Sequence, residues 1–163
     1  MTGRATPAIV ALTKAGIGHT LHEYVHDPRA QEKGLSYGLE AADALGLDPD
    51  QIFKTLLAEL DGALVVAVVP VSTLLDLKAL ARALGGSKAA MADPRAAERA
   101  TGYLTGGISP IGQKKPHRTV VDESAELYDV VYVSAGRRGL DMGIAPADLV
   151  EVTGAIVADI SRS

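Results

Sequence analysis

The chain has 163 residues, of which 47% are hydrophobic and 22% charged, a composition typical of a single soluble globular domain over residues 1–163. It contains no cysteine, which excludes disulfides, thiolate metal sites and a cysteine nucleophile. The formal net charge of −4 argues against extensive autonomous binding of DNA or long RNA, whereas contact with the end of an RNA, or binding helped by a partner, is compatible with it.

Membrane insertion and export are not indicated. No apolar run approaches the roughly 20 residues that span a bilayer. The N-terminal sequence MTGRATPAIVALTKAG lacks a basic region followed by an uninterrupted apolar stretch, so it does not resemble a signal peptide. We therefore expect a cytoplasmic protein with no membrane partner.

Clear start and stop signals mark the elements in the first part of the chain. Thr6 and Pro7 have the residue types of an N-cap and a first helical position, and Gly16 has that of a helix stop. The sequence HTLHEYVHD alternates in the manner of a strand. The predicted elements are a helix at 7–15, a strand at 19–27, a polar loop at 27–34 and an amphipathic helix at 37–46.

The strongest signal is the sequence IFKTLLAELDGALVVAVVP at 52–70. Two apolar runs flank Asp61 and Gly62, which favour the tight turn of a two-residue β-hairpin. Both runs are apolar at odd and even positions alike. Their strands are therefore expected to lie inside a sheet that is covered on both faces.

The rest of the chain alternates predicted helices and short strands. A helix at 74–86 places an apolar stripe on one face, formed by Leu74, Leu77, Leu80, Ala81 and Leu84. The later elements are a helix starting at Asp93, strands at 118–124, 129–136 and 138–144, a Pro-initiated helix at 145–154 and a closing strand at 155–160. This order predicts a mixed α/β domain of the α+β type, with a partly barrel-like β-sheet flanked by helices.

The residues His22-Glu23-Tyr24-Val25-His26 match the H-E-x-x-H pattern of zinc proteases. That pattern requires a helix, in which positions i and i+4 share a face. Along the strand predicted here, the two histidines would lie roughly 13 Å apart. We interpret the match as accidental, and neither a metal nor another cofactor is expected.

Lys54 is a charged residue within an apolar strand. Buried lysines are rare unless they are paired or functional, whereas a lysine near a strand end can extend its amine into water. The sequence leaves both interpretations open. At the edge of a pocket the ammonium group could bind phosphate, orient a carbonyl or stabilise negative charge.

The segment TGYLTGGISPIGQKK at 101–115, here called the glycine loop, matches neither the dinucleotide-binding nor the Walker pattern. Gly106 and Gly107 either form a plain surface turn or let the backbone approach a ligand and present N–H groups to an oxygen. Ser109 and Ser134 lie outside any G-x-S-x-G elbow, which favours hydrogen-bonding roles over nucleophilic ones.

Two arginines and a carboxylate follow one another in SAGRRGLD at 134–141. The SAGRRG part is either an exposed turn or the rim of an anion site. Arg137 or Arg138 is a candidate partner for Asp141. Such a pair would have little effect at a surface and a larger one in a cleft.

Several segments together resemble the YbaK family of free-standing aminoacyl-tRNA deacylases, which are related to the editing domain of bacterial prolyl-tRNA synthetases. The similarity covers about residues 5–161 and lies in TLHEYVHDP, YGLEAADALGLDPDQIFKTLLAEL, VVAVVPVSTLLDLKALARALGGSKAAMADPRAAERATGYLTGGISPIGQKK, TVVDESA and VYVSAGRRGLDMGIAPADLV. It is particularly similar to the branch that hydrolyses mischarged Cys-tRNA(Pro), and Cys-tRNA(Cys) is a second substrate compatible with it.

The resemblance implies the mixed, partly barrel-like fold of that family and a set of site residues. Lys54 corresponds to the family's catalytic lysine, and the substrate-binding positions correspond to Tyr24, Gly106, Gly107, Ile108, Ser109, Ser134 and Asp141. It also implies that the thiol of the substrate attacks its own ester carbonyl, which expels the tRNA and leaves a cyclic thiolactone. Lys54 would hold the terminal adenosine or a phosphate, and the Gly106 and Gly107 amides would receive the ester oxygen.

The partners implied by the resemblance are the aminoacylated 3′ end of mischarged tRNA and prolyl-tRNA synthetase. Two alternatives stay open. One is a deacylase that uses water to remove alanine or another small amino acid, and the other is a non-catalytic module that binds a small molecule or a protein. Extra residues around RAQEKGLS lengthen the loop at 27–36, whose role the sequence does not indicate.

Overall fold

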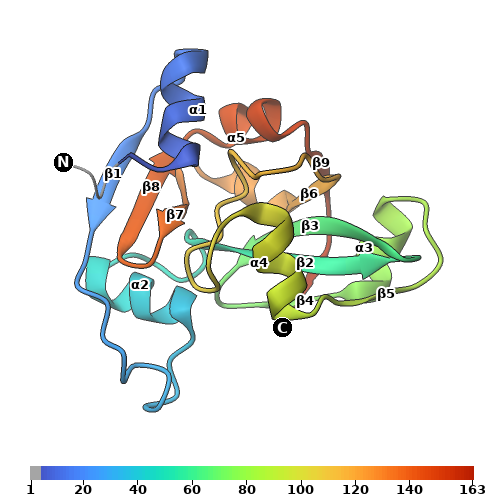
Figure 1. Cartoon of the computed structure of the whole chain (residues 1–163), viewed down its shortest axis with the longest axis horizontal. Helices are drawn as coiled ribbons and strands as arrows, with labels where there is room; N and C mark the ends of the chain where they lie inside the picture. The colour runs from blue at the N-terminus through green and yellow to red at the C-terminus, as the bar shows by residue number, and fades with distance from the viewer. Residues whose placement is uncertain (1–4) are drawn as a thin grey trace.

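The computed structural model describes residues 5–163 (Figure 1). In chain order its elements are α1 (Pro7–Ala15), β1 (Thr20–Glu23), α2 (Tyr37–Leu45), β2 (Phe53–Leu60), β3 (Ala63–Pro70), β4 (Leu74–Leu75), α3 (Leu77–Ala83), β5 (Ala89–Met91), α4 (Pro94–Thr101), β6 (Thr119–Asp122), the 3-10 helix η2 (Glu123–Leu127), β7 (Val131–Arg137), β8 (Leu140–Ile144), α5 (Pro146–Thr153), β9 (Ile156–Ala158) and β10 (Ser161–Arg162).

The strands form three sheets (Figure 1). The largest has the order β5-β2-β3-β6-β9, in which β5, β2 and β3 pair antiparallel while β3, β6 and β9 pair parallel. A second, antiparallel sheet has the order β1-β8-β7, and a short third sheet pairs β10 with β4. Over residues 5–163 the sheets stay open, so the predicted mixed α/β class is confirmed without a closed barrel.

The β2–β3 hairpin is confirmed as the centre of the large sheet. Asp61 and Gly62 have φ angles of 50° and 89°, as the mirror-image turn of a tight hairpin requires. The Asp61 carboxylate also accepts hydrogen bonds from the N–H groups of Ser87 and Lys88, each at 2.9 Å. These bonds tie the hairpin turn to the segment that leads into β5.

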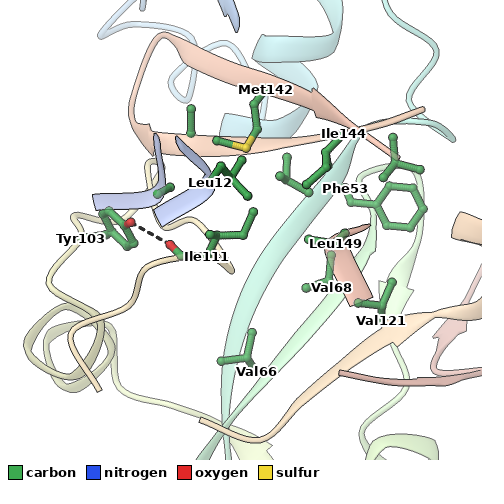
Figure 2. Close-up of a cluster of buried hydrophobic side chains, with 14 of the residues drawn as sticks. Leu12, Phe53, Val66, Val68, Tyr103, Ile111, Val121, Met142, Ile144 and Leu149 are labelled. Atoms are coloured by element: carbon green, nitrogen blue, oxygen red, sulfur yellow. Dashed lines mark hydrogen bonds between the residues drawn. The ribbon is translucent and has the colours of Figure 1, made fainter. Parts of the chain in front are cut away.

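Neighbouring residues of β3 pack into two different hydrophobic clusters. Val66 and Val68 join the first cluster, which fills the space between the two larger sheets and includes Leu12 of α1 and Leu149 of α5 (Figure 2). Val65, Ala67 and Val69 join the second, with Leu80 of α3. The strand is therefore buried on both faces, as predicted, and each fully buried valine contributes roughly 1.5–3 kcal/mol relative to an exposed one.

Several predicted limits differ from the structure, and three of them have a clear physical reason. The strand at 19–27 ends at Glu23, because the pairing of β1 with β8 stops there. The helix at 74–86 begins only after its N-cap Asp76, and Leu74 lies in β4 with half of its surface exposed. The strand at 118–124 ends at Asp122, whose carboxylate accepts the N–H groups of Ser124, Ile160 and Ser161.

Helix limits elsewhere follow the capping residues. Thr6 and Ser36 accept hydrogen bonds from the first turns of α1 and α2, and Gly16 and Gly46 end these helices in the left-handed conformation. Within residues 5–163, none of the helices has the length and apolar character needed to cross a lipid bilayer.

Candidate active site

A cavity of about 270 Å³ opens beside β2, where α2, α4, the glycine loop and the β7–β8 hairpin meet. Apolar side chains of β2, such as Phe53 and Leu57, form much of its wall. The predicted site residues that line it are Tyr24, Lys54, Gly106, Ile108, Ser134 and Asp141. Segments far apart in the sequence therefore converge on one cavity.

Lys54 lies near the start of β2, where it faces Val69 of β3 in the strand register. Its side chain is half-buried, and Nζ donates a 2.6 Å hydrogen bond to the carbonyl of Thr73, in the turn that follows β3. Burial lowers the pKa of the ammonium group below its ordinary value. The aliphatic part thus contributes to the cavity wall while the ammonium group is held in place by a backbone oxygen.

Asp141 is the buried charge of the cavity. It lies in β8, opposite Ser134 of β7 and His22 of β1, and is 6% exposed. Burial raises the pKa of its carboxyl group to about 7. Burial, and secondarily the charge of Asp141, raises the pKa of nearby Tyr24 to about 12, so the phenol remains protonated at neutral pH.

The expected pairing of Asp141 with an arginine is wrong. Arg137 extends toward Glu23, with 3.8 Å between Nη2 and Oε2, and Arg138 donates from Nε to the Thr105 carbonyl at 2.8 Å. Arg137 ends β7 and Arg138 follows it in the β7–β8 turn, and neither lines the cavity, whereas Asp141 does. Among residues 5–163, no hydrogen bond or ion pair joins the Asp141 carboxylate to another side chain.

The two central glycines of the glycine loop have different surroundings. Gly106 lines the cavity with φ of 88°, and a Cβ there would lie 2.5 Å from the ring of Tyr37. Gly107 lies outside the lining, and a Cβ there would lie 2.7 Å from the Cα of Arg137. Both positions require glycine, because a side chain at 106 would collide with the Tyr37 ring and one at 107 with the backbone of Arg137.

The expectation that both glycine amides face the substrate needs correction. The Gly107 N–H already donates to the Leu104 carbonyl at 2.8 Å, whereas the Gly106 N–H has no hydrogen-bond partner among residues 5–163. Ser109 is fully buried outside the cavity lining, and its Oγ accepts the Ile111 N–H at 3.2 Å. Gly107 and Ser109 therefore maintain the shape of the loop, and Gly106 carries its free donor.

Several lining residues were missed by the sequence reasoning. α2 contributes Tyr37, whose ring lies against Gly106 and under the guanidinium group of Arg138, 4.9 Å from ring centroid to Cζ. β2 contributes Thr55, whose Oγ1 is buried and has no hydrogen-bond partner in the described part of the chain. One sequence signal could have identified Tyr37: aromatic residues make up only 4% of the chain, so a tyrosine at the start of a helix is unusual.

The histidines of the H-E-x-x-H match lie in different environments. His22 is in β1 and its Nε2 lies 2.8 Å from Thr20 Oγ1, while His26 follows the strand and its Nδ1 lies 2.9 Å from Glu40 Oε1. The segment is thus a strand and a loop, not the helix that a zinc protease needs. No group of three or more potential metal ligands is found within the described part of the chain.

The chain belongs to the aminoacyl-tRNA editing domain family, whose model matches residues 36–152. It is 42% identical, over 122 residues, to a protein of Enterococcus faecalis named as the Cys-tRNA(Pro)/Cys-tRNA(Cys) deacylase EbsC, and the alignment covers 74% of each chain. This relationship confirms the family to which the sequence motifs point.

Solved structures have the same fold. One, described as a trans-editing enzyme for prolyl-tRNA synthetase, superposes with a TM-score of 0.82 at 28% identity and covers 96% of both chains. A second, the hypothetical protein APE2540, has a TM-score of 0.83 at 27% identity and covers 96% of this chain and 99% of its own. The described architecture is therefore shared with both of these structures.

Proposed function

We propose that this protein is a trans-editing deacylase that removes cysteine from Cys-tRNA(Pro). The observation that carries the proposal is that Lys54 and the unpartnered Gly106 N–H border the same small cavity. At about 270 Å³ the cavity lies at the small end of ligand sites, which suits an aminoacyl ester better than a whole nucleotide. The name of the Enterococcus faecalis relative supports the same substrate.

The cavity wall favours a nucleophile that comes from the substrate. Among the described lining residues there is no cysteine or histidine, so Ser134 lacks an imidazole base of the kind that activates a serine. The Ser134 Oγ instead accepts the N–H of Gly136 at 3.1 Å. A cysteinyl ester supplies a thiol that is a stronger nucleophile than a serine hydroxyl at neutral pH.

The proposed step is an intramolecular acyl transfer. The substrate sulfur attacks the ester carbonyl, a C–S bond forms, and the C–O bond to the terminal ribose breaks. The thiol proton ends on the released ribose hydroxyl, and water later opens the cyclic thiolactone to give free cysteine. The protein contributes orientation and stabilisation of the developing oxyanion, not covalent chemistry.

Each polar group of the wall has a role in this proposal. The Gly106 N–H receives the ester oxygen as negative charge develops on it. Lys54 holds the terminal adenosine or its phosphate, in exchange for its hydrogen bond to the Thr73 carbonyl. Asp141 and Ser134 face the substrate amino group, and Tyr24 keeps its proton as a hydrogen-bond donor.

The mechanism is tested by changing the amino acid on one tRNA. Cys-tRNA(Pro), Ser-tRNA(Pro) and Ala-tRNA(Pro) would be incubated with the protein, and loss of the aminoacyl group followed over time. We expect rapid loss of cysteine and loss of serine and alanine at the spontaneous rate, because serine replaces the sulfur by a poorer nucleophile and alanine has none. Equal cleavage of Ala-tRNA(Pro) would contradict the thiol mechanism and favour a water-using deacylase.

We also propose that prolyl-tRNA synthetase presents the substrate. A chain with a net charge of −4 gains little from phosphate contacts, so it is expected to hold free tRNA weakly and to select among tRNAs poorly. A synthetase that retains its mischarged product would supply the missing selectivity. The description of one structural relative as acting for prolyl-tRNA synthetase is consistent with this partner.

A further inference from the structure

The two peptide groups that flank Thr105, one on each side of its Cα, are each held by a charged side chain. The Thr105 N–H donates to Glu98 Oε2 at 2.8 Å, and the Thr105 carbonyl accepts from Arg138 Nε at 2.8 Å. Glu98 belongs to α4, and Arg138 to the β7–β8 turn. One residue of the glycine loop is therefore fixed between two elements that are themselves anchored in the fold.

This fixation sets the direction of the Gly106 N–H. The Thr105 carbonyl and the Gly106 N–H belong to one peptide group, and no cis peptide bond is present in residues 5–163. In a planar trans peptide the C=O and N–H bonds point in opposite directions. Because the carbonyl accepts from Arg138 Nε, the N–H points away from that side chain, and we infer that it points toward the cavity that Gly106 borders.

Arg138 is itself held in place by an aromatic ring. Its guanidinium group lies over the ring of Tyr37, 4.9 Å from the centroid, within the range of a cation–π contact. The same ring packs against Gly106, where a Cβ would approach it to 2.5 Å. Tyr37 thus links the orientation of the guanidinium group to that of the glycine whose amide is free.

We propose that Arg138 is a positioning residue that aims the Gly106 N–H at the ester oxygen and strengthens it as a donor. A cation on the carbonyl of a peptide polarises the whole peptide group, so its N–H becomes a better hydrogen-bond donor. The role of Arg138 is exerted through the Thr105 peptide and requires no contact with substrate. This inference rests on the proposed function, because it assigns how one of its donors is held.

The experiment compares two substitutions of Arg138 in single-turnover and steady-state deacylation of Cys-tRNA(Pro). Arg138→Met retains an aliphatic cover for Tyr37 but has no donor, whereas Arg138→Lys retains a cationic donor. A misaligned oxyanion donor lowers the rate of the chemical step, and displacements near 1 Å can cost about 100-fold. We expect Arg138→Met to lower kcat by roughly 10- to 100-fold with KM within twofold, and Arg138→Lys to recover most of it.

Arg99→Met is the matched control for loss of surface charge. Arg99 is an exposed arginine in the last turn of α4, and it makes no hydrogen bond to the glycine loop among the described residues. We expect its kcat to stay at the wild-type value. If Arg138→Met instead raises KM, with a salt dependence that Arg99→Met shares, Arg138 acts as a phosphate contact and the positioning role is wrong.

A second readout separates this inference from the proposed function. In ¹⁵N-labelled protein, Arg138→Met is expected to shift the Gly106 amide resonance and to lower the order parameters of Thr105 and Gly106, with Arg99→Met as the unchanged reference. A wild-type protein that leaves Cys-tRNA(Pro) intact would reject the proposed function alone. Unchanged Gly106 amide parameters in Arg138→Met would reject the positioning role, whatever the activity.

Discussion

Asp141 is a buried carboxylate in a largely apolar cavity, and among residues 5–163 it has no side-chain hydrogen bond or ion pair. It is 6% exposed, and burial raises its pKa to about 7. Keeping such a group costs stability in the free protein, because its charged form loses water without gaining a partner. A substrate ammonium group would supply that partner, and the cost therefore fits a binding role.

The same pKa makes stability depend on pH through Asp141. Its pKa rises from 3.8 to about 7 on folding, so the folded protein retains a proton that the unfolded chain releases between about pH 4 and pH 7. This contribution to stability is present at pH 4 and is lost as the pH rises through 7. We expect Asp141→Asn to be more stable than wild type at pH 8, by on the order of 1–3 kcal/mol.

Urea unfolding of both proteins at pH 4.5 and pH 8 measures this effect. The difference should shrink to about a quarter of its pH 8 value at pH 4.5, because the folded carboxyl group is protonated there and the pH lies less than one unit above the unfolded pKa of 3.8. A difference of the same size at both pH values would mean that the side chain acts by its shape and not by its charge.

Most of the site residues that the sequence predicted line the cavity, but the sequence did not predict the contacts that they make. Lys54 stood out because a lysine is unusual in an apolar strand, and the structure gives it a half-buried stem and a backbone partner. The distinction between Gly106 and Gly107 depends on one hydrogen bond inside the loop and on the backbone of Arg137. Contacts of that kind form only when distant segments meet, and no local pattern encodes them.

Among the elements, α2 and the loop at 27–36 are joined through Glu40. Its buried carboxylate accepts the Asp27 N–H at 2.7 Å and contacts His26 Nδ1 at 2.9 Å. α2 also carries Tyr37, which borders the cavity. The loop that the sequence left without a role is thereby attached to a wall of the candidate site.

Removing this attachment should loosen the loop. In Glu40→Ala, two half-buried polar groups lose their partner, and we expect a loss of on the order of 1–2 kcal/mol in unfolding free energy. Trypsin should cut sooner at Arg29 and Lys33, both of which are exposed in the loop. Asp43→Ala, an exposed change on the same helix, is the control and should leave the cleavage pattern unchanged. Equal cleavage of both variants would show that Glu40 does not hold the loop.

The elements that the sequence predicted best are those with local signals. The hairpin turn at Asp61 and Gly62 and the caps at Thr6 and Gly16 fix conformation over a few residues. The short strands β4, β5 and β10 were not predicted, because two or three residues carry no periodicity and their pairing is decided by the rest of the fold. The start of the predicted helix at 74–86 is β4 for the same reason, since its pairing with β10 outweighs the local helical pattern.

Because the whole molecule carries a net negative charge, we expect it to recognise tRNA with the help of a partner protein. With a net charge of −4, the protein is expected to bind free tRNA only weakly, and the binding should fall further as salt rises. Adding prolyl-tRNA synthetase should increase the deacylation rate at limiting tRNA. Nanomolar binding of free tRNA that does not respond to salt would contradict this division of roles.

We propose that Lys54, held at the cavity edge by the Thr73 carbonyl, is required for removal of cysteine from tRNA. The most direct measurement is the rate of Cys-tRNA(Pro) deacylation by wild type and by Lys54→Ala, with circular dichroism and thermal unfolding of both. We predict that the substitution reduces the rate to the spontaneous level, while the fold is retained with a loss of about 1 kcal/mol for the missing hydrogen bond. A folded Lys54→Ala protein that deacylates Cys-tRNA(Pro) at the wild-type rate would contradict the account.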